Sequence, residues 1–100
     1  MSVYLMLTTL TDTGRKTLQD DPEFLKDINK EVEFMGAKIL IQYALLGQYD
    51  FVNILEAPSN EAIAKLAIRL SAKGTTQTLT LTAIPIDDLI STLKNRENPW

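Results

Sequence analysis

Two hydrophobic periodicities alternate along the chain, and they predict strands and helices in turn. Short apolar runs predict strands over 3–7, 39–46 and 49–56, and a threonine–leucine alternation predicts a fourth strand over 75–83. Apolar residues spaced three and four positions apart predict helices over 22–35 and 60–73, and a shorter one over 86–93. A brief helical turn through Leu18 is also expected after the first strand.

Capping residues mark where the two long helices begin and end. Asp21 and Pro22 are typical of a helix N-terminus, as the cap and the first helical residue, and Gly36 is placed to end that helix. Ser59 or Asn60 is expected to cap the second long helix. No repeat or low-complexity linker interrupts the pattern, so we expect one domain over 1–97 and a short tail over 98–100.

The predicted order of elements is strand-helix-strand-strand-helix-strand, followed by a helix. Right-handed crossovers and one tight hairpin arrange such a chain as a ferredoxin-like α+β fold. We therefore predict a four-stranded antiparallel sheet with strand order 4-1-3-2, both long helices on one face, and an extra C-terminal helix.

A two-residue hairpin loop at Gly47-Gln48 sets the pairing of the second and third strands. In this register Gln42 lies opposite Asn53, Ala44 opposite Phe51 and Leu40 opposite Leu55, and the other face of the hairpin is aliphatic. Because the aliphatic face matches two apolar helices better, we expect the face that carries Gln42 to stay uncovered. It would then expose the apolar residues of a homodimer interface: Tyr4, Met6, Leu40, Leu46, Phe51 and Leu55. The alternative is that the C-terminal helix of the same chain folds back over this face.

Polar side chains on that same face are candidates for a small-ligand site. Gln42 and Asn53 face each other, Thr8 shares their parity, and Thr80 on the fourth strand is expected to join them. A few converging polar groups in an apolar surrounding are typical of ligand pockets. The alternative is a structural amide pair in which Gln42 and Asn53 satisfy only each other.

Composition narrows the chemistry that this chain can perform. The 100 residues include no cysteine and no histidine, and the formal net charge is −3. We therefore expect no disulfide, no metal site, no cofactor and no histidine-based catalysis, and a cytoplasmic location fits the lack of cysteine. The acidic balance argues against nucleic acid as a partner, and no stretch is apolar enough for a membrane span or a signal peptide.

Three short segments resemble the GYD domain family, which is named for a Gly-x-Tyr-Asp signature. They are Thr11-Asp12-x-Gly14, Leu46-Gly47-Gln48-Tyr49-Asp50 and Glu56-Ala57-Pro58, in the order that the family shows. The resemblance implies a dimeric α+β barrel without an established activity. It also marks Gly47, Tyr49 and Asp50 as signature positions, which adds Tyr49 and Asp50 to the candidate ligand-binding residues. The alternative is that the motif only holds the turn and the interface, with Asp50 accepting hydrogen bonds from donors near the turn.

Three functions remain open from the sequence. One is a homodimeric protein with a small-ligand-binding or structural role, acting through the sheet face. A second is a cofactor-independent enzyme, by analogy with monooxygenases and isomerases of dimeric α+β barrels, although no catalytic residue is identified. A third is an RNA-recognition-like module, suggested by the same element order and by sheet aromatics, which the net negative charge disfavours.

Overall fold

The computed structural model describes residues 1–95, so the predicted tail over 98–100 and the predicted domain end at residue 97 lie outside the described part. Eight elements follow one another along the chain. They are β1 (Ser2–Leu10), α1 (Asp12–Asp20), α2 (Phe24–Phe34), β2 (Lys38–Ala44), β3 (Phe51–Ala57), α3 (Asn60–Ala72), β4 (Thr76–Ala83) and α4 (Ile86–Lys94).

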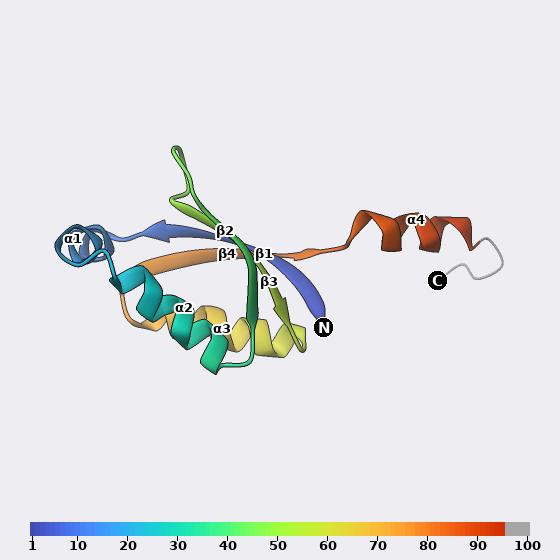
Figure 1. The fold of residues 1–100 in the computed structure, drawn as a ribbon, viewed down its shortest axis with the longest axis horizontal. Helices are drawn as coiled ribbons and strands as arrows, with labels where there is room; N and C mark the ends of the chain where they lie inside the picture. Colours follow the sequence, from blue (N-terminus) through green and yellow to red (C-terminus); the bar gives the residue numbers. More distant parts are fainter. Residues whose placement is uncertain (96–100) are drawn as a thin grey trace.

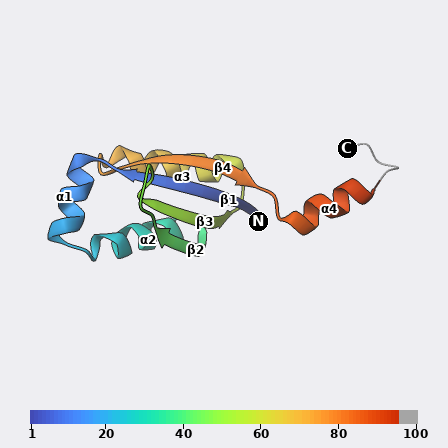
Figure 2. The same ribbon diagram turned by 90° about the horizontal axis from the view of Figure 1, so that it is seen from above.

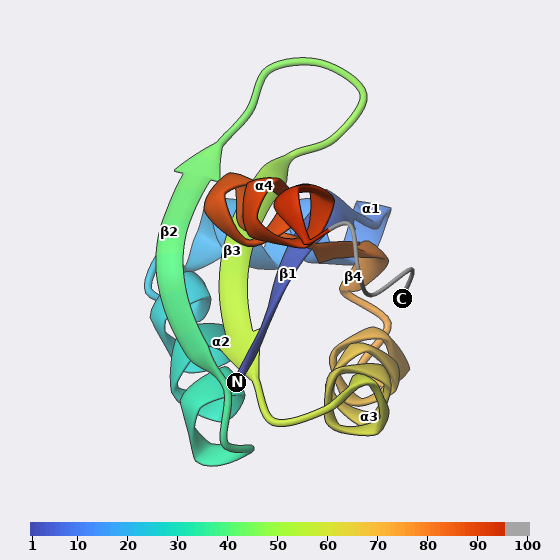
Figure 3. The same ribbon diagram turned by 90° about the vertical axis from the view of Figure 1, so that its right-hand side faces the viewer.

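The four strands form one antiparallel sheet in the order β2-β3-β1-β4. This is the predicted order 4-1-3-2 read from the other edge, so the α+β fold prediction is confirmed. Helices α2 and α3 lie on one face of the sheet, α2 near β2 and α3 near β4 (Figures 1 and 3). Helix α1 lies at one end of the sheet, and α4 projects beyond the opposite end (Figure 2).

Helix α1 is longer than the predicted turn, and it changes where α2 begins. The Thr11 hydroxyl accepts a hydrogen bond from the Gly14 N–H at 3.0 Å and caps α1. The Asp21 N–H donates to the Thr17 carbonyl and closes α1, while the Asp21 side chain accepts from the Glu23 N–H at 3.2 Å in the turn that precedes α2. Helix α2 therefore begins at Phe24 rather than Pro22. The Ser59 cap of α3 is confirmed, because its hydroxyl accepts from the Ala62 N–H at 3.1 Å.

The register of β2 against β3 is largely as predicted. Gln42 pairs with Asn53 and Ala44 with Phe51. The predicted pairing of Leu40 with Leu55 is wrong, because the ladder shifts between Ile39 and Ile41 and leaves Leu40 unpaired in a bulge. As a result Ile39 and Ile41, which look equivalent in an alternating pattern, point to opposite faces of the sheet.

The connection between β2 and β3 is wider than a two-residue turn. The Leu45 N–H donates to the Asp50 carbonyl at 2.8 Å, which leaves residues 46–49 as the tip. The predicted tight turn at Gly47-Gln48 is therefore wrong, although Gly47 does adopt the expected positive φ, at 141°. The loop rises from the sheet on the side away from α2 and α3 (Figure 1).

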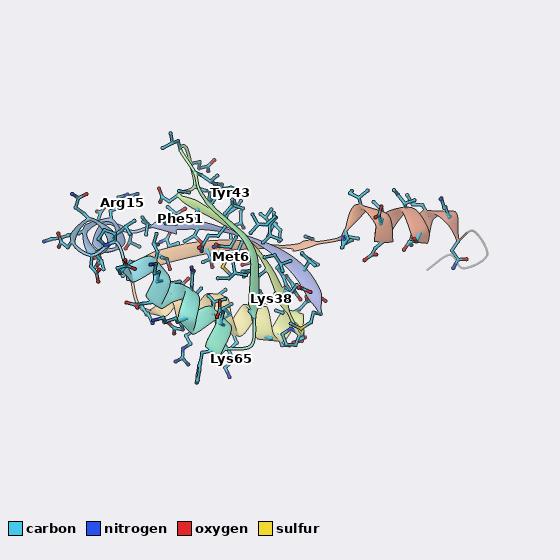
Figure 4. All side chains as sticks on the ribbon, viewed as in Figure 1. Met6, Arg15, Lys38, Tyr43, Phe51 and Lys65 are labelled. Atoms are coloured by element: carbon cyan, nitrogen blue, oxygen red, sulfur yellow. The ribbon has the colours of Figure 1, made fainter. Side chains whose placement is uncertain are left out.

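The assignment of the two sheet faces is the main correction. The residues predicted to share a face do so on β1 and β3, but the helices cover the opposite face from the one expected. Tyr4, Met6 and Leu55 are each only 1% exposed and form the core with residues of α2 and α3. Figure 4 shows Met6 on the side of the helices and Tyr43 on the other side.

Polar partners on the helices explain this choice of face. The Tyr4 hydroxyl donates to the Asn60 side chain at 2.6 Å, and Gln42 bonds with Asn29 of α2. A polar group under a helix is stable when the helix supplies its hydrogen-bond partner. The more polar face can therefore be covered, and the aliphatic face is the one that stays open.

Candidate functional site

Three side-chain amides from three elements meet between α2 and the sheet. Gln42 of β2 exchanges two hydrogen bonds of 2.9 Å with Asn29 of α2, and its amide also donates to the Asn53 carbonyl oxygen of β3 at 2.7 Å. Both side-chain N–H groups of Gln42 are thus used. The predicted facing of Gln42 and Asn53 is confirmed, but the two amides do not satisfy only each other, because Asn29 of α2 also bonds Gln42.

A cavity of about 40 Å³ lies beside this amide cluster, which we define as Asn29, Gln42 and Asn53. Its polar lining comes from the cluster and from Thr8, Thr76 and Thr78. The rest of the lining is apolar and includes Met6, Leu25, Ile28, Val32, Phe51 and Leu55. The structure therefore brings together three of the predicted ligand-binding residues: Thr8, Gln42 and Asn53.

Thr80, a fourth predicted member, lies in a different hollow. A space of about 220 Å³ between α3 and β4 is lined by Thr80 and Thr82, by Tyr4 and Asn60, and by small residues of α3. The Thr80 hydroxyl is buried and has no hydrogen-bond partner among the described residues. The hollow is wide open along the edge strand β4, and Thr80 does not reach the amide cluster.

Tyr49 and Asp50 do not line the cavity, and Asp50 lies at the C-terminal end of β1. The Asp50 carboxylate accepts a hydrogen bond from the Leu10 N–H at 2.7 Å, and the Asp50 N–H donates to the Thr8 carbonyl at 2.9 Å. These contacts fasten the β2–β3 loop to β1. The aspartate of the signature therefore has a structural role, because its carboxylate accepts a charge-assisted hydrogen bond from a backbone N–H.

The other early motif fastens the same end of β1 from the opposite side. The Thr11 N–H donates to the Thr75 carbonyl at 3.0 Å, and the Thr11 hydroxyl donates to the Gly74 carbonyl at 2.7 Å. Gly14 is buried there, and a Cβ at this position would lie 2.0 Å from the Thr75 carbonyl oxygen. Two signature segments thus converge on one strand end and hold it in place.

The predicted interface residues are divided between four environments. Tyr4, Met6 and Leu55 belong to the covered core, and Phe51 lines the cavity. Leu40 lies at the bulge, and Leu46 is fully exposed at the tip of the β2–β3 loop. The prediction that these side chains share an uncovered face is therefore wrong.

The uncovered face, which we call the open face, carries two cross-strand rows of apolar residues. Each row runs over all four strands, as the pairing of β1 with β3 and β4 and of β2 with β3 shows. Tyr43 is 64% exposed, Leu81 50%, and Ile41 and Leu79 44% each. The rows are Ile41, Ile54, Leu5 and Leu81, and then Tyr43, Val52, Leu7 and Leu79.

Electrostatic contacts join the two helices on the covered face. Glu31 of α2 accepts from the Arg69 side chain of α3 at 2.7 Å and also pairs with Lys73. The hydrogen bonds from Lys73 and Arg69 lower the pKa of the Glu31 carboxyl below its ordinary value. This ion-pair cluster lies outside the cavity and links α2 to α3.

Two residues of this region were missed by the sequence reasoning: Asn29 and Asn60. Asn29 stands at helical spacing from Leu25 and Val32, both of which face the sheet, so the helical period could have placed it on the covered face. Asn60 was considered only as a cap. Its partner Tyr4 was assigned to the wrong face, which hid their contact.

The cavity can hold a neutral group but offers little for proton transfer. Among the residues that the structure describes, its lining consists of amides, hydroxyls and apolar side chains, with no carboxylate, lysine or arginine. The volume admits one or two water-sized groups. Of the helices within residues 1–95, none has the length and apolar composition that crossing a membrane requires.

The fold and site together define a class: a small α+β protein whose antiparallel sheet is covered on one face and apolar on the other. Residues 4–93 match the model of the GYD domain, and this chain belongs to the GYD domain family. A relative from Thermus thermophilus is 44% identical over 95 residues, which cover 94% of this chain and all of the relative. That relative is named glutamine synthetase and cystathionine beta-lyase binding protein.

Proposed function

We propose that this protein is a self-associating protein that binds other proteins, with glutamine synthetase and cystathionine beta-lyase as its partner enzymes. The partner names come from the Thermus relative. The single observation that carries the proposal is the open face, where two apolar rows cross the whole sheet and no helix within residues 1–95 covers them.

An uncovered apolar face that extends over all four strands supports contact with another protein. In a chain that acts alone, the helices would be expected to cover the most apolar face of the sheet. Here they cover the face that carries the amide cluster and the threonines of β4. Large exposed apolar patches mark interaction surfaces, and a second copy of the chain is the simplest partner for such a patch.

The self-association is tested by sedimentation velocity of Tyr43→Lys at micromolar concentration. The expected result is a dimer for the wild type and a monomer for the variant, because a lysine in the contact would bury a charge without a partner. Ile68→Lys is the matched control, since Ile68 is 71% exposed on α3, away from the open face. A wild-type monomer would overturn this part of the proposal.

The binding of enzymes is tested by biolayer interferometry with purified glutamine synthetase and purified cystathionine beta-lyase. Both enzymes are expected to bind the immobilised protein with dissociation constants on the order of 10 µM or lower. Serum albumin at the same concentration is the control for nonspecific adsorption. An absence of binding to both enzymes would contradict the proposed partners while leaving the self-association intact.

The cavity beside the amide cluster supports a second candidate function, the binding of a small neutral molecule. Thr8, Gln42 and Asn53 would supply its hydrogen bonds, and the apolar lining would enclose the rest. Native mass spectrometry of the purified protein tests this. A mass increment that disappears in Gln42→Leu supports a ligand, whereas a bare chain mass in repeated preparations contradicts it.

A further inference from the structure

Helix α4 is amphipathic and stands apart from the rest of the protein. Its apolar stripe is exposed: Ile86 67%, Leu89 42%, Ile90 42% and Leu93 69%. No residue of α4 is buried. The molecule is 57 Å long along its longest axis, and α4 occupies one end of that length, beyond the sheet (Figures 1 and 2). Such a stripe gains stability only from packing against another apolar surface.

We propose that α4 packs across the open face of a second copy of this chain, and that the two copies exchange their α4 helices reciprocally. This inference rests on the proposed self-association and adds how it is achieved. It assigns α4, rather than the partner's sheet, as the element that covers the two aliphatic rows.

The dimensions of the two surfaces agree. Helix α4 has nine residues and is therefore about 13 Å long. Four strands lie side by side in the sheet, so the axes of the outer two are about 14 Å apart. A helix that lies perpendicular to the strands is therefore parallel to the two rows and is long enough to extend from β2 to β4. Its stripe, at spacings of three and four residues, presents one continuous apolar edge to them.

The segment that precedes α4 directs the helix away from its own sheet. Ile84 and Pro85 are all that separates β4 from α4, and Pro85 is extended, with φ −54° and ψ 137°. Proline fixes its own φ and biases the preceding residue toward an extended conformation. The chain therefore continues outward along the direction of β4, instead of reversing over its own open face.

The buried area is sufficient for a stable dimer. Each α4 stripe offers on the order of 300 Å² of apolar surface, and each open face loses a similar area beneath it. Since the exchange occurs twice, the two helices and two faces bury on the order of 1,200 Å² in total, within the range of stable interfaces. Neither surface belongs to the core of the single chain, so both are available without unfolding.

The experiment compares full-length variants by sedimentation velocity and equilibrium. Leu89→Glu combined with Ile90→Glu places two charges on the stripe, and the dimer dissociation constant is expected to rise about a hundredfold or more. Ser91→Glu combined with Lys94→Gln changes the net charge by the same amount outside the stripe, and it is expected to leave the constant unchanged. Because no α4 residue is buried, the circular dichroism spectrum and melting temperature of the monomer should be retained in both variants.

The lack of cysteine allows a direct test of the contact. A Leu89→Cys chain and a Leu81→Cys chain are mixed and oxidised, and a disulfide between the two different chains is expected. A chain that carries both Leu89→Cys and Leu81→Cys is expected to form cross-linked dimers. A cross-linked monomer would show that α4 folds back over its own sheet, and this result would overturn the exchange.

The outcomes separate this inference from the proposed function. A dimer that resists the α4 charges but dissociates with Tyr43→Lys would overturn the exchange and keep the self-association. A wild-type monomer would overturn both. Binding of the two enzymes is measured separately, and its loss would leave the exchange standing.

Discussion

At the scale of single residues, two signature motifs of the chain hold the C-terminal end of β1 in place. Asp50 binds the Leu10 N–H from one side, and Thr11 binds the Gly74–Thr75 backbone from the other. A strand end with satisfied backbone groups resists fraying. The signature residues therefore secure the geometry of β1, on which the sheet and the cavity both depend.

Gly14→Ala is expected to destabilise the protein by about 2–4 kcal/mol. The added Cβ would lie 2.0 Å from the Thr75 carbonyl oxygen, a backbone atom that can move only if α1 separates from the start of β4. The measurement is the free energy of unfolding from chemical denaturation. Thr13→Ala, an exposed change one residue earlier in α1, is the control and should cost less than about 0.5 kcal/mol.

Asp50→Ala is expected to cost about 1–3 kcal/mol, because the Leu10 N–H would lose its acceptor. Asp50→Asn keeps an acceptor oxygen and should lose less. Hydrogen exchange of the Leu10 amide reports the contact directly. If Leu10 exchanges equally slowly in the wild type and in Asp50→Ala, the structural task assigned to Asp50 is wrong.

At the scale of elements, polar contacts decide how the helices sit on the sheet. The amide cluster ties α2 to the β2–β3 hairpin, and Tyr4 with Asn60 ties α3 to β1. Glu31 then ties α2 to α3. Each helix is thus attached to the sheet by directional hydrogen bonds as well as by its apolar stripe. The apolar stripe determines which side of the helix is buried, and the hydrogen bonds determine where on the sheet the helix lies.

The amide cluster predicts non-additive stability effects. Asn29→Ala and Asn53→Ala each remove one partner of Gln42 and should cost about 1 kcal/mol, since the cluster is partly open to solvent. When Gln42 is also replaced by Ala, the changes in unfolding free energy caused by Asn29→Ala and Asn53→Ala should become nearly additive. The coupling free energy between Asn29→Ala and Asn53→Ala is obtained from chemical denaturation of all combinations of the three changes. If this energy is the same with Gln42 and with the Gln42→Ala change, the three amides do not form one network.

The Glu31 ion pairs predict a pH dependence with a definite sign. The pKa of Glu31 is lowered in the folded protein, so its contribution is fully present above the ordinary carboxyl pKa of about 4.3 and is lost as the pH falls through the lowered value. Glu31→Gln should therefore cost about 1 kcal/mol at neutral pH, and the difference from the wild type should shrink in acid. Glu33→Gln, exposed on the same helix, should show no such pH-dependent difference.

The sequence was sufficient for the order of elements, the strand order and the pairing of Gln42 with Asn53, because these depend on local periodicity and on chain connectivity. It was insufficient for the choice of the covered face. Alternation shows which residues share a face, whereas the covered face depends on partners such as Asn29 and Asn60, which lie on other elements. The width of the loop likewise depended on Asp50 binding a distant strand.

At the scale of the whole molecule, the described chain has a covered half and an uncovered half. The covered half holds the core, and the uncovered half consists of the open face and α4. A chain of 100 residues has a small core, so burial between copies adds a large fraction to its stability. Folding and association are therefore expected to be coupled.

This coupling predicts a melting temperature that depends on protein concentration. For a dimer that unfolds to separate chains, each tenfold rise in concentration should raise the melting temperature by about 3–5 °C. The dependence should vanish for the Leu89→Glu and Ile90→Glu double variant. Calorimetry over a hundredfold concentration range measures both, and a melting temperature independent of concentration would contradict the coupling.

The bulge at Leu40 has a consequence for how the length of this chain can vary. Lys38 and Ile39 pair with Glu56 and Leu55, and Ile41 pairs with Ile54, so the ladder on either side of Leu40 is already in consecutive register. Removing this one residue would keep every cross-strand partner and every side chain on its present face. In most strand positions a one-residue deletion inverts the faces of the strand. Leu40 is thus a position at which a homologous chain can be one residue shorter and still form the same sheet.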